Sequence, residues 1–114
     1  MIAHVRGKLV AKDLDRVEIM TQGGTGYELA VPLSVYEMLP KVGEDTALHT
    51  HLVVREDGWQ LFGFATVVEK RVFQRLLTAS GIGPALALGM LSKPAPDRIV
   101  RATPEMSGAA LPSA

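Results

Sequence analysis

The sequence contains no cysteine, and only 5% of its 114 residues are aromatic. A chain without cysteine cannot form disulfide bonds, a zinc site with thiolate ligands or a cysteine nucleophile. An excess of charge of one sign is also lacking, because 12 Lys and Arg residues balance 12 Asp and Glu residues. This balance excludes a uniformly basic nucleic-acid-coating protein and an acidic disordered tail, but it does not say where the charges lie.

Long hydrophobic runs and nucleotide-binding motifs are missing as well. The longest nearly uncharged apolar run, residues 79–92, contains Gly and Pro and is too short to cross a bilayer. The first residues lack the apolar core of a signal peptide. Neither a Walker-type phosphate loop nor a Gly-x-Ser-x-Gly elbow occurs. We therefore expect a cytoplasmic protein with no membrane partner, no cofactor and no ATPase activity of its own.

Up to residue 66, short runs rich in Val, Leu and Thr alternate with Gly and Asp turns, a pattern typical of strands and hairpins. The predicted strands are residues 2–11, 16–21, 26–31, 46–54 and 59–64, with a helical turn at residues 34–39 after the third strand. Five strands with a short helix after the third form the element order of an OB-type Greek-key barrel. Residues 1–66 are therefore predicted to form a five- to six-stranded OB-fold barrel.

After residue 66 the apolar residues recur at helical spacing, so the whole chain is predicted to be an α+β protein. Thr66 and Glu69 fit a capping box at the start of the first helix. Gly81 ends that helix, and Pro84 suits the first position of a second helix that runs to about residue 91. Residues 67–114 are thus expected to be a small helical segment, with one or two further turns at residues 97–102 and a loose tail beyond.

The turn between these two helices matches the helix-hairpin-helix pattern, a glycine-hydrophobic-glycine turn followed by a helix start. Glycines let a ligand approach the backbone, and the first N–H groups of a helix can bind a phosphate oxygen without reading base sequence. The predicted phosphate donors are the amides of Gly81, Ile82, Gly83 and Ala85, with Ser80 as an accessory contact. A plain pair of helices with a glycine cap remains an equally open interpretation.

Glu56 and Asp57 place two adjacent carboxylates at the tip of the last predicted hairpin. Asp-Gly is ordinary turn chemistry, so a solvated turn is the favoured interpretation from these residues alone. A metal site is not expected here, because adjacent strand residues point to opposite faces.

His49 and His51 lie on one face of a predicted strand. Such a pair can bind a metal ion, but the only further candidate ligand is the distant His4. Side chains on an outward sheet face are the favoured interpretation, and no metal site is predicted.

Taken together, the motifs resemble the RuvA family, which comprises the Holliday-junction-binding subunits of the bacterial branch-migration machine. The resemblance is carried by residues 1–2, 5–7, 23–28, 50–57, 60–64 and 81–84, in the same order and spacing. Residues 50–64 are its most specific part.

The resemblance implies a non-catalytic DNA-binding protein of recombination, repair and the SOS response. It implies a homotetramer, and paired tetramers, that hold an open four-way DNA junction, with the RuvB motor ATPase and the RuvC resolvase as partners. Glu56 and Asp57 match the acidic pin of the family, which crowds the junction centre and keeps strands apart. Arg55 is a candidate for an accessory DNA contact beside this pin.

The sequence departs from the family in two places. Ala85 stands where the family usually has Lys, so one phosphate-neutralising charge is missing. The chain ends at the approach to the second helix-hairpin-helix, before the domain that contacts RuvB, so we expect a fragment or a shortened protein. Weak, strongly salt-dependent junction binding follows from this. The alternatives are an oligomerisation module with little DNA binding and a generic single-strand-binding OB domain.

Divided at residue 66, the balanced charge becomes uneven. Residues 1–66 hold six basic and nine acidic side chains, whereas residues 67–114 hold six basic and three acidic ones. The predicted acidic tip thus belongs to an acidic barrel, and the predicted phosphate-binding turn belongs to a basic segment.

Overall fold

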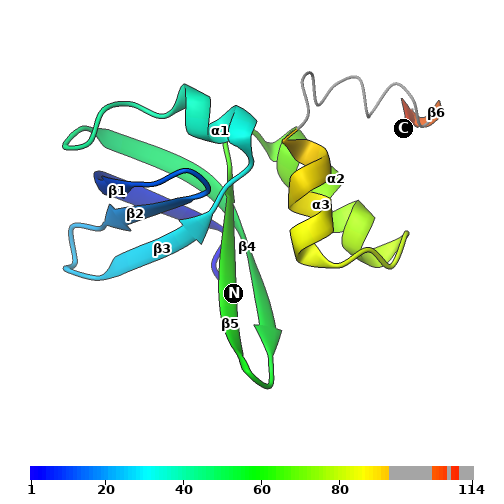
Figure 1. Cartoon of the computed structure of the whole chain (residues 1–114), viewed down its shortest axis with the longest axis horizontal. Coiled ribbons are helices and arrows are strands. Elements are labelled where there is room, and N and C mark those ends of the chain that lie inside the picture. Colours follow the sequence, from blue (N-terminus) through cyan, green and yellow to red (C-terminus); the bar gives the residue numbers. More distant parts are fainter. Residues whose placement is uncertain (93–103, 108, 111–114) are drawn as a thin grey trace.

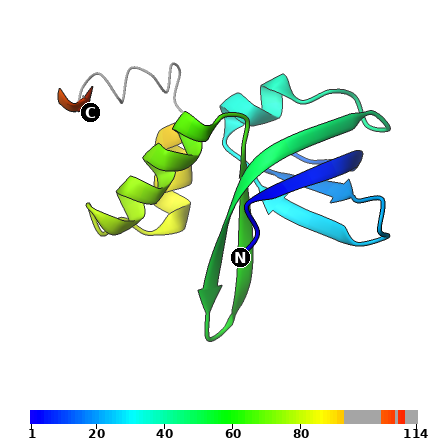
Figure 2. The same cartoon turned by 180° about the vertical axis from the view of Figure 1, so that it is seen from behind.

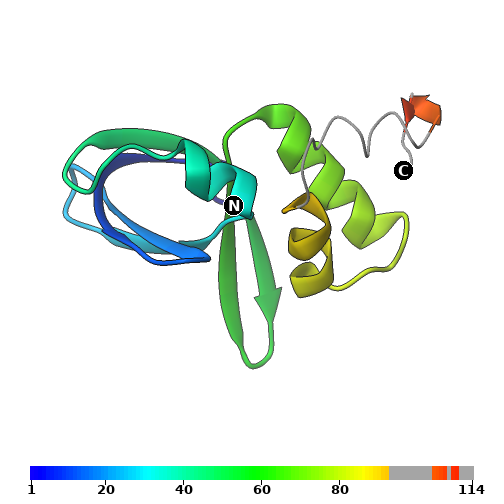
Figure 3. The same cartoon turned by 45° about the horizontal axis from the view of Figure 1, so that its top comes forward.

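Five strands close into a barrel in the order β1-β2-β3-β5-β4 (Figures 1 and 3). The computed structural model describes residues 1–92, 104–107 and 109–110. The barrel strands are β1 (His4–Lys12), β2 (Arg16–Met20), β3 (Gly26–Ala30), β4 (Asp45–Arg55) and β5 (Gly58–Phe64). Neighbouring strands are antiparallel except β3 and β5, which pair in parallel and close the barrel. The predicted OB-type barrel is confirmed, and all five strands lie where the sequence pattern predicts them.

Strand β1 bends because it is shared between two neighbours. Its first half pairs with β4 and its second half with β2, and Lys8 has a partner in each strand. A Cβ atom on Gly7 would collide with the carbonyl oxygen of Met20, so only glycine permits this close passage. A register shift between Leu9 and Ala11 adds a local irregularity that helps the strand turn.

The barrel interior is filled by the inward-facing apolar residues of every strand and is closed by the short helix α1 (Leu33–Met38). Val35 of α1 is fully buried among them. Thr50 is the polar exception inside the barrel, and its hydroxyl donates a hydrogen bond of 2.7 Å to the carbonyl oxygen of Ile2. The buried members of this cluster are Val5, Leu9, Val17, Ile19, Leu29, Val31, Val35, Leu48 and Leu61.

Two helices, α2 (Val67–Thr78) and α3 (Pro84–Leu91), pack against the outer face of the barrel (Figure 2). Phe73 of α2 is fully buried, with its ring centroid 4.9 Å from that of Phe62 and 5.0 Å from that of Phe64. Ala87 and Leu91 of α3 complete this second apolar cluster, together with Ala30 of the barrel. The helices are therefore joined to the barrel by a continuous core.

The connection at residue 66 is further fixed by Glu69, which is only 7% exposed. The predicted capping box is present, because Glu69 N–H donates to Thr66 Oγ1 and Glu69 Oε1 accepts from Thr66 N–H, both at 3.1 Å. Glu69 Oε2 also accepts a hydrogen bond of 3.3 Å from the hydroxyl of Ser34 in α1. One carboxylate thus ties the start of α2 to the helix that closes the barrel.

Beyond α3, strands β6 (Pro104–Ser107) and β7 (Ala109–Ala110) form a short antiparallel pair that the sequence pattern does not predict. The helical turns predicted at residues 97–102 lie outside the described residues, and the loose tail stays a prediction. Among the helices of the described residues, none has the length and apolar character needed to cross a membrane.

Candidate nucleic-acid interface

The β4–β5 hairpin extends well beyond the barrel (Figure 1). Its outermost strand pair is Arg55 with Gly58, which leaves Glu56 and Asp57 as the two-residue turn. Every residue from 54 to 60 is exposed to solvent. Among the described residues, no Lys, Arg or His lies within salt-bridge distance of either tip carboxylate. The tip therefore presents two uncompensated negative charges.

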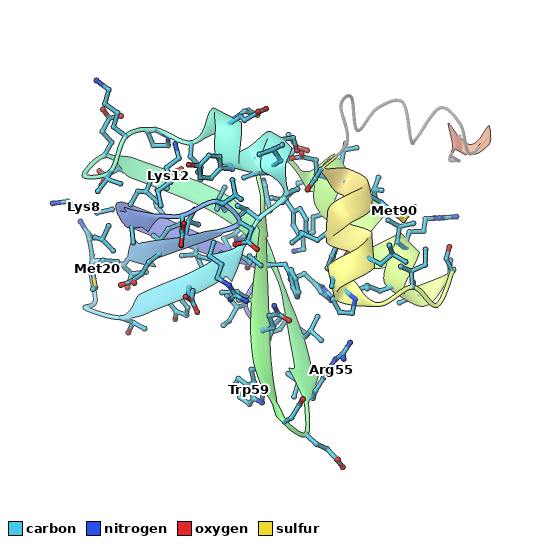
Figure 4. The ribbon with its side chains drawn as sticks, in the orientation of Figure 1. Lys8, Lys12, Met20, Arg55, Trp59 and Met90 are labelled. Atoms are coloured by element: carbon cyan, nitrogen blue, oxygen red, sulfur yellow. The ribbon has the colours of Figure 1, made fainter. Side chains whose placement is uncertain are left out.

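The two faces of the hairpin have different surroundings. The pair Leu52–Leu61 packs in the barrel core, and the next pair on that face, Val54–Trp59, has left the barrel. Val54 is 59% exposed and Trp59 is 72% exposed. The side chain of Arg55 lies on the side of the hairpin that faces α2 and α3, and that of Trp59 on the other side (Figure 4).

The turn between α2 and α3 has the backbone geometry of two helices joined through glycine. Gly81 has a φ angle of +66°, which L side chains adopt only with strain. Gly83 is the N-cap of α3, and Pro84 occupies the first turn of that helix, as predicted. The turn lies at the end of the helix pair that is farther from α1 (Figures 1 and 3). The β4–β5 hairpin extends from the barrel on that same side.

One of the four predicted phosphate donors is engaged within the protein. The N–H of Ile82 donates a hydrogen bond of 3.1 Å to the carbonyl oxygen of Leu76, and the Ile82 side chain packs against the second apolar cluster. Ile82 therefore fixes the end of α2. The sequence pattern predicts that its amide binds a phosphate, but this amide donates to Leu76 within the protein. Within residues 1–92, the amides of Gly81 and Gly83 donate to no backbone or side-chain acceptor. Ala85 follows Pro84 in the first turn of α3, where helix amides have no intrahelical partner.

Gly83 has no internal reason to be a glycine. Its φ of −70° and ψ of 160° are open to any residue, and a Cβ atom built there would meet no atom within 4 Å. Gly81 also faces open space, although its positive φ explains the glycine at that position. The protein side of the turn thus leaves the approach to the Gly81, Gly83 and Ala85 amides open.

Basic side chains of α2 lead toward this turn. Arg71 and Arg75 are exposed and four residues apart, so they lie on one side of the helix, and Arg75 is in its last turn. Ser80 and Ala85 are exposed on either side of the turn. This surface can receive an anion through backbone amides, with arginines nearby, but Ala85 adds no charge of its own.

His49 and His51 have different neighbours in the structure. His49 stacks edge-on against His4 at 5.4 Å between ring centroids, whereas His51 is covered by α2, with its Nδ1 atom 3.1 Å from Gln74 Nε2. Burial, and next the positive charge of Lys70, lower the pKa of His51 from its ordinary value of 6.5. Among the described residues, no three His, Cys, Asp or Glu side chains gather as a metal site. His51 faces outward from the barrel, as expected, but serves the barrel–helix contact.

The sequence of this chain is similar to those of known proteins. The chain is 60% identical over 105 residues to the Holliday junction branch migration complex subunit RuvA of Gemmatimonas aurantiaca, covering 92% of this chain and 53% of that relative. The subunits of the same name from Rubrobacter xylanophilus and Halorhodospira halophila are 47% identical over 102 residues and 46% identical over 101 residues. These two alignments cover 90% and 89% of this chain, and 52% and 49% of the respective relatives.

The chain thus spans about half the length of the curated relatives it matches. The model of the family described as the RuvA N terminal domain matches residues 1–63, which include strands β1 to β4, the turn at Glu56 and Asp57, and all of β5 except its last residue. The chain belongs to the RuvA N-terminal domain family.

Proposed function

We propose that this chain binds four-way DNA junctions as a non-catalytic, cytoplasmic DNA-binding subunit of a branch-migration complex in recombination and repair. The observation that carries this proposal is the open turn between α2 and α3, where glycine at position 83 serves no internal contact. Open space at this glycine, next to Gly81 and Gly83 amides that have no acceptor within residues 1–92, lets a ligand come close to the backbone. The names of the relatives support the choice of junction DNA as that ligand.

In this proposal the amides of Gly81, Gly83 and Ala85 donate hydrogen bonds to the phosphate backbone of one DNA arm. The N-terminus of α3 adds a partial positive charge, which favours an anion there. Such contacts position the protein on DNA without reading base sequence. Ser80 is close enough in the chain to add a hydroxyl contact, and Arg75 supplies neighbouring positive charge.

Glu56 and Asp57 act as the acidic pin in the same proposal. Phosphates that converge at the centre of a junction meet two uncompensated carboxylates at the end of a protruding hairpin. Like charges at close range repel, so the tip favours strands that pass around it over strands that close across it. Arg55, on the side facing the helices, provides an accessory contact to a passing strand.

One α2–α3 turn per chain serves one arm, so an assembly of four chains matches the four arms of a junction. We therefore include in the proposal a homotetramer, and paired tetramers, with the RuvB motor ATPase and the RuvC resolvase as the partners of the full-length family. The barrel supplies the surface for self-association in this arrangement.

A gel-shift titration tests the proposal directly. The chain is titrated against a four-way junction, a duplex of the same arm sequence and a single strand, at several salt concentrations. We expect the junction to bind at least about tenfold more tightly than the duplex, with an affinity that falls steeply with salt. Light scattering of the same samples reports the oligomeric state.

Three results would contradict the proposal in different ways. Equal affinity for junction and duplex at moderate salt removes junction specificity. A tetramer that binds none of the three DNAs identifies an assembly module, and tighter binding of the single strand identifies a generic OB domain.

A further inference from the structure

Trp59 is the only tryptophan of the chain, and it is 72% exposed near the end of the β4–β5 hairpin. The other aromatic residues have partners in the fold. The three Phe side chains are buried in the barrel–helix core, and the two Tyr side chains are half-buried against the barrel core. The large apolar ring of Trp59 lies outside both cores, so most of its surface contacts solvent in the isolated chain.

The position of Trp59 in the hairpin is defined by its neighbours. It pairs across the strands with Val54, which is 59% exposed, so the two side chains share one face. Only Gly58 lies between Trp59 and the turn residue Asp57. The indole therefore lies directly behind the acidic tip, on the hairpin face away from α2 and α3 (Figure 4).

The surroundings of Trp59 favour a nucleobase as its partner. Phosphates are repelled by Glu56 and Asp57, whereas a base is neutral and offers a flat π-face for an aromatic ring. Where strands leave one arm of a junction for another, the last base pair of an arm can lose a stacking neighbour. An exposed indole beside the strand-separating tip replaces that neighbour.

A second copy of the chain fits the surface around Trp59 less well. The exposed apolar surface there consists of Val54 and Trp59, bordered by charged and polar residues such as Arg55, Glu56 and Gln60. Even a fully buried tryptophan contributes only about 150–250 Å². A stable protein interface needs about 800 Å² per partner. The patch suits a ring-sized ligand.

We propose that Trp59 stacks on a nucleobase at the point where the strands of a bound junction separate. This inference rests on the proposed junction binding and assigns a role to a residue outside the phosphate-binding turn and the acidic pin. The tip repels the backbone, and the indole next to it holds the base that the separation exposes.

The test uses the fluorescence of Trp59, since no other tryptophan contributes to the emission of the protein. The chain is mixed with junctions that carry 2-aminopurine either at the branch point or in the middle of one arm. We expect quenching of 2-aminopurine at the branch point and not within the arm, together with a change in Trp59 emission. Duplex DNA of the same sequence should leave the Trp59 emission nearly unchanged.

Substitutions give a second readout by gel shift. We expect Trp59→Ala to weaken junction binding about fivefold to a hundredfold and Trp59→Phe to recover part of that loss. Leu14→Ala is the matched control, because Leu14 is also an exposed apolar residue, 69% accessible, but lies in the β1–β2 turn of the barrel. This control should leave the affinity unchanged.

The outcomes separate this inference from the proposed function. Junction binding by the parent chain with unchanged Trp59 and 2-aminopurine signals overturns the stacking role alone. Absence of junction binding overturns both. A blue shift of Trp59 emission that grows with protein concentration in the absence of DNA overturns the stacking role in favour of self-association.

Discussion

The hairpin tip and the α2–α3 turn both project from the fold, but they present opposite chemistry. The tip exposes side chains, namely the carboxylates of Glu56 and Asp57 with Trp59 behind them. The turn exposes backbone, because Gly81 and Gly83 have no side chains and Ala85 has only a methyl group. One site can therefore repel phosphates while the other receives them.

This difference determines how each site can be altered. Side chains at the tip can be exchanged without affecting the fold, since residues 54–60 are exposed throughout. The turn can be obstructed only by adding atoms to its backbone, and a Cβ atom at position 83 does so at little structural cost. What the two sites share is the barrel–helix core that fixes them relative to each other.

The largest effect is expected where that shared core is removed. Phe73→Ala deletes a fully buried ring that contacts Phe62 and Phe64 across the barrel–helix contact. Loss of a buried phenyl ring costs about 3–5 kcal/mol in the free energy of unfolding. Chemical denaturation followed by circular dichroism measures this loss.

Val68→Ala on the same helix is the control, because Val68 is 57% exposed. We expect it to change the free energy of unfolding by about 0.5 kcal/mol or less. If Phe73→Ala proves too unstable to fold, Phe73→Leu keeps part of the side-chain volume. We expect it to give an intermediate loss in the free energy of unfolding. Equal stabilities of the Phe73 and Val68 variants would mean that the helices do not depend on this core.

A smaller effect is expected when the turn is obstructed and the tip is left unchanged. Gly83→Ala places a methyl group on the open approach to the amides, so we expect junction affinity to fall about tenfold. The free energy of unfolding should change by about 1 kcal/mol or less, because the backbone angles at residue 83 suit alanine. Gel shift and denaturation of the same samples give the two values.

Gly89→Ala is the matched control for this variant. Gly89 lies inside α3, is exposed, and an added Cβ would meet no atom within 4 Å. Alanine inside a helix is favoured over glycine by about 0.5–1 kcal/mol, so this variant should be slightly more stable with unchanged DNA affinity. Equal DNA affinities for the two glycine variants would remove position 83 from the binding surface.

The third prediction neutralises the tip and leaves the turn unchanged. Glu56→Gln combined with Asp57→Asn removes the repulsion between the tip and converging phosphates, so junction affinity should stay equal or rise by up to about fivefold. The separation of base pairs at the branch point should decrease. The fluorescence of 2-aminopurine placed at the branch point measures this separation. Glu44→Gln with Asp45→Asn removes the same charge from another adjacent, exposed pair and should not alter the opening.

A sharp loss of affinity in the tip variant would contradict the acidic-pin role. It would mean that these carboxylates support the hairpin structure. Since Glu56 and Asp57 have no salt-bridge partner in the described part of the chain, such a loss has no explanation in the present contacts.

The sequence predicts the elements of this fold well because their signals are local. Alternating apolar residues predict each barrel strand, and Thr66 with Glu69 predicts the helix start through the capping box. The parallel pairing of β3 with β5 and the length by which the hairpin leaves the barrel are not local. Both features depend on how the strands close around the core. This closure cannot be predicted from the residues of any single segment.

The candidate site shows the same limit at the level of single atoms. The pattern of residues 81–85 predicts four similar amide donors, but the N–H of Ile82 donates to the carbonyl oxygen of Leu76. Alternation along β5 does not reveal that Trp59 lies past the last core pair, since Leu61 on the same face is buried. Neighbours that are distant in sequence decide both points.

The smallest predicted effect concerns pH at the core that joins the two sites. Burial, and next Lys70, lower the pKa of His51, whose ring lies 5.8 Å from that of Phe73 and beside Gln74. Because the unfolded chain then binds a proton more readily than the folded one, stability should fall as the pH drops below 6.5 toward the lower pKa of the folded state.

The pH effect is measured by denaturing the parent chain and His51→Gln at pH values from neutral to mildly acidic. The difference in stability between the two proteins should shrink or reverse as the pH falls, since glutamine keeps a polar partner for Gln74 but takes up no proton. A difference that does not change with pH would mean that His51 does not titrate as part of the barrel–helix contact.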